Sequence, residues 1–178
     1  MNELSIIDNQ LAHVEGVLGF SSKKNLKEES CPGAHALIRA VNDVEAVKTW
    51  LSRYLEKSKT HQCYEREALR FLMWCQFEAG KTLAGLQVED CERYFEFLKN
   101  PKASWCATRA DLQQGRLSPR WRPFTGPLSV AGFNKAVAIL QTLFSFLAKA
   151  RYLDFNVMSL AKKPKNFEKT QAELQYQV

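Results

Sequence analysis

Residues 129–151 read SVAGFNKAVAILQTLFSFLAKAR, and this stretch decides the fold. Its apolar residues recur at the three- and four-residue steps of one helical face. Ser129 is a good N-cap, because its hydroxyl can accept a hydrogen bond from an unpaired backbone N–H of the first turn. Roughly 23 residues at a rise of 1.5 Å make a rod of about 35 Å. The stretch therefore predicts one long helix as the central packing element of an all-α domain.

The opposite face of this predicted helix carries no carboxylate. A solvated helix face usually mixes both signs of charge, whereas a face without acids suits contact with a polyanion. The residues on it are small or polar: Asn134, Lys135, Ala138, Gln141, Thr142, Ser145 and Lys149.

Three shorter helices are predicted before it, over residues 42–57, 60–79 and 88–99. Asn42 or Asp43 can cap the first, and Thr60 can cap the second. Gly80 stands where a helix commonly ends in a left-handed residue. Residues 1–40 are weakly patterned and are expected to form an arm that is partly mobile.

Residues 100–128 form a long insertion punctuated by proline and glycine. Loops of this length in a compact domain are usually functional or mobile. Trp105, Trp121 and Phe124 need burial, so we expect the insertion to fold back and cover Trp74 and Phe77. Its bases outnumber its single acid, Asp111, between residues 101 and 123; they are Lys102, Arg109, Arg116, Arg120 and Arg122. Arg120 and Arg122 either reach along a phosphate backbone or are simply solvated.

The second predicted helix carries Arg66 and Arg70 opposite its apolar stripe, and Thr60 lies at its start. Helix-start N–H groups commonly hold phosphate, and arginine offers paired donors to phosphate or to guanine. The alternative is a solvated surface on which Glu65 and Glu67 are intrahelical partners of these arginines.

The composition is mildly basic, and no motif in the sequence points to catalysis. The chain of 178 residues has 25 Lys and Arg against 19 Asp and Glu, a net charge of +6, which is compatible with a nucleic-acid partner. Its five cysteines and three histidines have no metal-site spacing, and free thiols indicate a reducing cytoplasm. No enzyme signature is present. We therefore expect no metal, no cofactor, no small-molecule substrate and no membrane partner, since no run of about 20 apolar residues occurs.

A series of motifs in one order carries a family resemblance. The series is Thr60-x3-Tyr64-x3-Ala68-x2-Phe71-x2-Trp74, then Gly80-Lys81-x-Leu83-x2-Leu86, then Asp90-x3-Tyr94-x2-Phe97-Leu98, then Leu128-Ser129, Asn134-Lys135-x-Val137-x2-Leu140-x2-Leu143-Phe144-x-Phe146-Leu147 and Arg151-Tyr152-Leu153-x2-Asn156. It resembles the N-terminal core-binding domain of phage-integrase-type tyrosine recombinases.

The resemblance implies a four-helix, SAM-like orthogonal bundle over residues 41–161. In that family this domain forms half of a clamp around duplex DNA, with its second and fourth helices against the major groove. The implied partners are double-stranded DNA and other recombinase protomers, in a bacterial or phage-encoded, nucleoid-associated protein of the cytoplasm. Carried over by position, the DNA contacts are Thr60, Arg66, Arg70, Asn134, Lys135, Gln141 and Ser145.

The family's catalytic residues belong to a second domain that this sequence does not include. Residues 162–178 are then expected to be a linker towards it, and this chain is expected to bind DNA without cutting it. The alternative is a helical protein-interaction domain, in which the aromatic residues and the N-terminal arm meet another protein.

Overall fold

The computed structural model of the protein describes residues 35–114 and 120–164. Within these residues the chain is helical, and the only β-type pairing is an isolated bridge between Cys106 and Phe124, so the predicted all-α class is confirmed. The tail from residue 165 and most of the predicted arm lie outside the described residues. The elements are α2 (Asp43–Leu51), α3 (Lys59–Trp74), the π-helix η1 (Cys75–Ala79), η2 (Leu83–Gly85), α4 (Val88–Lys99), η3 (Ala103–Trp105), α5 (Arg109–Leu112), α6 (Val130–Lys149) and η4 (Val157–Ser159).

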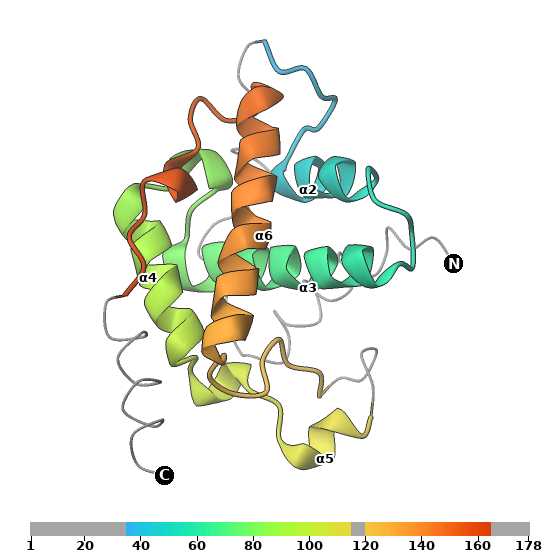
Figure 1. Ribbon diagram of the computed structural model, residues 1–178, viewed down its shortest axis with the longest axis vertical. Helices are drawn as coiled ribbons and strands as arrows, with labels where there is room; N and C mark the ends of the chain where they lie inside the picture. Colours follow the sequence, from blue (N-terminus) through green and yellow to red (C-terminus); the bar gives the residue numbers. More distant parts are fainter. Residues whose placement is uncertain (1–34, 115–119, 165–178) are drawn as a thin grey trace.

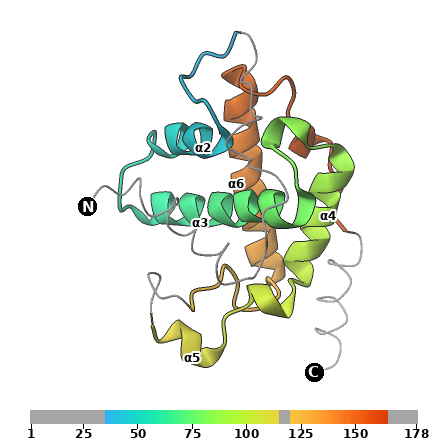
Figure 2. The same ribbon diagram turned by 180° about the vertical axis from the view of Figure 1, so that it is seen from behind.

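Helix α6 is the central element, as its length predicts. It stands across α3 in Figure 1, with α2 and α4 on either side, and it lies behind α3 when the molecule is turned in Figure 2. Contacts join α6 to α2, α3, α4 and η4. Its inward face buries Phe133, Ala136, Val137, Ile139, Leu140, Leu143, Phe144 and Leu147.

By length and composition alone, α6 could cross a membrane, because an 18-residue window of this 20-residue helix has a mean hydropathy of 1.4. The prediction that no stretch qualifies was therefore too strict. In the fold, one side of α6 is packed into the core, where Leu140 and Phe144 are fully enclosed.

The helix ends follow local capping chemistry, with two departures from prediction. Ser129 caps α6 by accepting a hydrogen bond from the backbone N–H of Gly132. The Asn42 side chain caps α2 in the same way, by accepting from the backbone N–H of Glu45. The cap of α3 is Ser58, which accepts from His61 at 3.1 Å, so the prediction of Thr60 is wrong. Helix α2 ends at Leu51, well before the predicted residue 57.

Gly80 ends the second helix as predicted. The chain leaves α3 through the π-helix η1, and Gly80 then adopts a left-handed φ of 63°. A Cβ at this position would meet nothing within 4 Å, so a substitution there tests the backbone cost alone.

We expect Gly80→Ala to lower the free energy of unfolding by about 1–2 kcal/mol, the cost of a left-handed residue that carries a Cβ. Urea denaturation measures it. Gly85→Ala is the matched control, because Gly85 has no left-handed φ and its Cβ would make only ordinary contacts. An equal loss in both variants would contradict the explanation.

Asp90 is a buried carboxylate at the start of α4. Burial alone raises its pKa, but hydrogen bonds from Lys81 Nζ at 2.6 Å and from the backbone N–H of Gln87 outweigh this effect. The charges of Lys81 and Arg93 add to them, and the pKa lies below its ordinary value of 3.8. The ionised form therefore stabilises the fold above about pH 4, and this contribution is lost as the pH falls through the folded-state pKa.

We expect Asp90→Asn to be less stable than the wild type by about 1–3 kcal/mol at pH 7, since charged hydrogen bonds are lost. The difference should narrow as the pH falls below about 4, where the wild-type carboxylate also becomes protonated. Denaturant unfolding at a series of pH values measures this. A constant difference from pH 7 to pH 3 would show that the charge of Asp90 is not the cause.

The insertion folds back onto the domain, as predicted. Trp105 and Phe124 are buried, and the Trp105 ring packs against Phe77 and Phe97 at 6.4 and 5.2 Å between centroids. The prediction for Trp74 differs from what the structure shows: its ring packs on Tyr94 of α4 and lies beneath the Arg93 guanidinium.

Candidate nucleic-acid interface

The outward face of α6 is exposed and free of carboxylates, as its sequence predicts. Lys135 and Lys149 supply its charge, and their positions on the helix are about 21 Å apart at 1.5 Å per residue. We call this set the α6 face. Its exposed members are Ala131, Asn134, Lys135, Ala138, Thr142 and Lys149.

Two cations from other parts of the chain lie beside the α6 face. Lys163 donates from Nζ to the Asn134 side-chain oxygen at 3.0 Å. The Arg53 guanidinium lies 5.3 Å from the centre of the Phe146 ring. Sequence reasoning missed both, because each is brought to α6 by tertiary packing and no local pattern marks either of them.

Gln141 and Ser145 do not belong to the outward surface in the way that was predicted. Gln141 donates from its amide nitrogen to the carbonyl of Met158 at 2.7 Å. Ser145 Oγ accepts from the amide of Asn156 at 3.2 Å. Both side chains are half-buried, and they hold the segment around η4 against α6.

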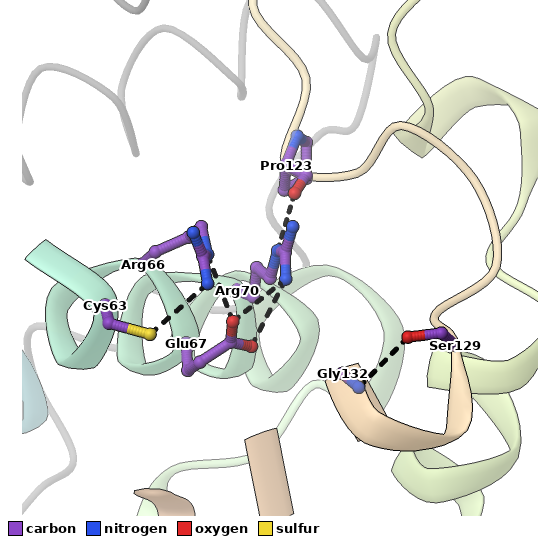
Figure 3. A network of polar contacts seen from close by, with 7 residues as sticks. All are labelled: Cys63, Arg66, Glu67, Arg70, Pro123, Ser129 and Gly132. Carbon is purple, nitrogen blue, oxygen red and sulfur yellow. Dashed lines mark hydrogen bonds and ion pairs between the residues drawn. The ribbon is translucent and has the colours of Figure 1, made fainter. Parts of the chain in front are cut away.

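Arg70 is the largest departure among the predicted contacts. Its side chain is only 11% exposed, and it donates from Nε to the carbonyl of Pro123 at 2.6 Å. Its NH1 group donates to both carboxylate oxygens of Glu67, at 3.1 and 3.3 Å, and its guanidinium lies 4.6 Å from the centre of the Phe124 ring. Figure 3 shows these bonds joining α3 to the insertion. Arg70 is thus a structural residue, not the outward-facing donor that the helical wheel predicted.

Glu67 is the buried centre of this network. Its side chain is 5% exposed and also accepts from Arg66 Nε at 3.1 Å. Arg66 also donates from its NH2 nitrogen to Cys63 Sγ at 3.3 Å. The Arg66 side chain is 49% exposed. The alternative prediction named Glu65 and Glu67 as intrahelical partners of the arginines. The pairing is right for Glu67, but Glu67 and Arg70 are nearly enclosed, and only Arg66 is solvated.

Arg66 and Lys135 lie on different sides of the contact between α3 and α6. Phe71 of α3 meets Phe144 of α6 with 5.6 Å between ring centroids. At 100° per residue, Arg66 lies about 140° around α3 from Phe71, and Lys135 lies about 180° around α6 from Phe144. Arg66 therefore points away from α6 while Lys135 points away from α3. The single surface predicted from both helices is not formed by this pair.

The remaining predicted contacts lie at the start of α3 and in the insertion. Thr60 and Arg120 are exposed, whereas Arg122 is half-buried and donates to the carbonyl of Trp121 at 3.0 Å. Hydrogen bonds from Thr108 hold the pKa of Asp111 below its ordinary value, and the charges of Arg120 and Arg122 contribute. Asp111 therefore offsets part of the positive charge of the insertion.

The sequence did not predict that Asp43 and Glu67 are buried and hold polar networks inside the domain. Asp43 accepts from the backbone N–H of Leu83 and from the hydroxyl of Tyr152, both at 2.8 Å. The only local signal for Glu67 is its spacing of three residues from Arg70, which is also common on solvated helices.

The described residues offer no metal centre, and the Cys91 thiol is not activated. Residues 35–114 and 120–164 contain no group of three or more His, Cys, Asp or Glu side chains that could hold a metal ion. Burial, with the nearby charges of Asp90 and Glu92, raises the pKa of Cys91 to about 12, so this thiol stays protonated.

Comparison with known proteins identifies no relative. The chain matches no protein-family model, no curated protein and no solved structure. The α6 face therefore has to be interpreted from its own residues.

Proposed function

We propose that this chain is a DNA-binding domain of the core-binding type found in tyrosine recombinases, and that it holds duplex DNA along the α6 face. The observation that carries the proposal is the exposed face itself, which presents two lysines and no carboxylate. The SAM-like four-helix arrangement is part of the proposal. The order of the helices and the crossing of the long α6 over α3 support it.

The composition of the α6 face suits a phosphate backbone. Duplex DNA carries one negative charge per about 1.7 Å of axis, and a protein that neutralises phosphates releases their counterions. Lys135 and Lys149 can contact phosphates about 21 Å apart. Ala131 and Ala138 lie in the same exposed surface, and their small side chains allow the helix to approach the duplex closely.

The flanking cations extend this surface without help from α3. Arg53 lies over the ring of Phe146, and Lys163 is hydrogen-bonded to Asn134. The proposed surface does not require Arg66, and it excludes Arg70, Gln141 and Ser145, whose polar groups are bonded within the domain.

The rival function, a protein-interaction domain, rested on Trp74 and Phe77 as exposed aromatic residues. Trp74, Trp105 and Phe124 are each at most 2% exposed. Trp74 is therefore a core residue, as Trp105 and Phe124 were expected to be, and Phe77 is half-buried against Trp105.

Fluorescence anisotropy with the full chain and a labelled 40-base-pair duplex tests the function over a series of salt concentrations. The logarithm of the binding constant should fall linearly with the logarithm of the salt concentration, with a slope of about −0.9 for each phosphate contact. Failure to bind a long duplex even at low salt would overturn the proposal.

A further inference from the structure

An open groove of about 820 Å³ runs along α4, between the end of the second helix and the segment at residues 162–164. In Figure 1 this is the side of α4 next to the last described segment of the chain. Its aromatic lining consists of Trp74 and Phe97.

The charge of this groove is opposite to that of the chain. Four carboxylates line it, against two cations, Arg93 and Lys162, in a protein with a net charge of +6. Three of the carboxylates follow one face of α4 because of their spacing. The four are Glu78, Glu89, Glu92 and Glu96. This excess of carboxylates in the lining favours a cationic partner over a phosphate backbone.

Part of this acidic charge is used within the fold, and part faces outward. Glu78 accepts from Lys102 and from the indole nitrogen of Trp105. Glu92 accepts from the backbone N–H of Lys162 at 3.0 Å. Glu89 and Glu96 are exposed, and the bond of Glu96 to Lys99 is long, at 3.5 Å. These two residues are therefore the groove's best acceptors for an incoming cation.

The groove already holds one example of the chemistry that fits it. The Arg93 guanidinium lies 5.7 Å from the centre of the Trp74 ring, a cation–π arrangement. Phe97 is half-buried in the same lining. A lysine or arginine side chain has an aliphatic stem for an aromatic surface and a charged head for a carboxylate rim.

We propose that this α4 groove docks a segment of a protein partner that carries lysine or arginine next to an apolar side chain. The apolar groups pack against Phe97 and the stem of Arg93, while the cations pair with Glu89 and Glu96. This site does not depend on DNA binding, because the α6 face and the groove have opposite charge and different residues.

The test uses ¹⁵N-labelled full chain and a defined probe, a synthetic helical peptide in which arginine and leucine alternate with alanine. Amide shifts of α4 and of residues around Trp74 should move on titration. A peptide with citrulline in place of arginine keeps the shape and removes the charge, and it should bind at least several-fold more weakly. Shifts that map to α6 or are spread over the whole surface would overturn the proposal.

A pair of charge-matched variants makes the test specific. The double variant Glu89→Gln with Glu96→Gln should bind the arginine peptide about three- to tenfold more weakly, in line with the loss of two exposed ion pairs. The control, Glu56→Gln with Asp154→Asn, changes the net charge equally at exposed positions outside the groove, and it should leave probe binding unchanged. Equal weakening in both would assign the effect to net charge and overturn the site. DNA affinity, measured in parallel, separates this result from the proposed function, because the groove variants should not weaken it.

Discussion

Glu67→Ala is expected to lower the free energy of unfolding by about 3–5 kcal/mol, because it leaves the charge of Arg70 without its partner beneath the insertion. Both side chains of this pair are nearly enclosed, at 5% and 11% exposure. Arg70 is also held by the carbonyl of Pro123 at 2.6 Å, so it cannot turn to solvent without detaching the insertion. A loss of this size is a large part of the stability of an ordinary domain.

Urea unfolding, followed by tryptophan fluorescence, measures this loss. Glu56→Ala is the matched control, since Glu56 is exposed, and it should change the stability by no more than about 0.5 kcal/mol. If Glu67→Ala unfolds at the same urea concentration as Glu56→Ala, the network does not stabilise the fold.

A double substitution separates the buried charge from the packing. Replacing both members of the pair, in Glu67→Met with Arg70→Met, removes the unpaired charge together with the ion pair. The double variant should lose less free energy of unfolding than Glu67→Ala does, because well-packed apolar groups often replace a buried ion pair at little cost. A double variant that is less stable than the single variant would assign the effect to the bond between Arg70 and Pro123.

The helix boundaries that sequence predicts well are those set by local chemistry. Val88–Lys99 coincides with the predicted third helix, and Ser129 and Gly80 have the capping roles expected of them. Serine oxygen, glycine backbone and the apolar repeat act within a few residues, so a single sequence contains the information.

The predictions fail where two neighbouring residues could both cap a helix, or where distant parts of the chain determine whether a side chain is buried. Ser58 and Thr60 are both acceptable caps, and only the structure shows that Ser58 accepts from His61. Glu67 and Arg70 have the spacing of a solvated pair, yet Pro123 and Phe124 arrive from more than 50 residues away and cover them. No periodicity in α3 predicts that cover.

The candidate site shows the same division. The missing acids on the outer side of α6 are a property of the sequence, and the exposure of Lys135 and Lys149 agrees with it. A helical wheel cannot show that the segment around η4 takes up Gln141 and Ser145. It also gives no angle between helices, so it placed Arg66 and Lys135 on one surface although they point away from each other's helix.

Neutralising the two lysines of the α6 face should remove most of the DNA affinity that this surface supplies. If Lys135 and Lys149 each contact a phosphate, Lys135→Gln with Lys149→Gln should reduce the salt slope by about 1.8, since each contact contributes about 0.9. Charge reversal, in Lys135→Glu with Lys149→Glu, should cost on the order of a hundredfold in affinity, or about 2.8 kcal/mol. Anisotropy titrations over a salt series measure both quantities.

The matched control neutralises Lys59 and Arg109, which are exposed cations on α3 and α5. It makes the same change in net charge, and the salt slope should stay within about 0.5 of the wild type, because a slope reports contacts and not total charge. Equal losses in the two double variants would mean that DNA is attracted by net charge alone. A slope changed only by the control would move the interface to the side of Arg66 and the insertion. The slope therefore decides between two faces of one small domain, and Lys135 and Lys149 are where the exposed, acid-free surface of α6 predicts the loss.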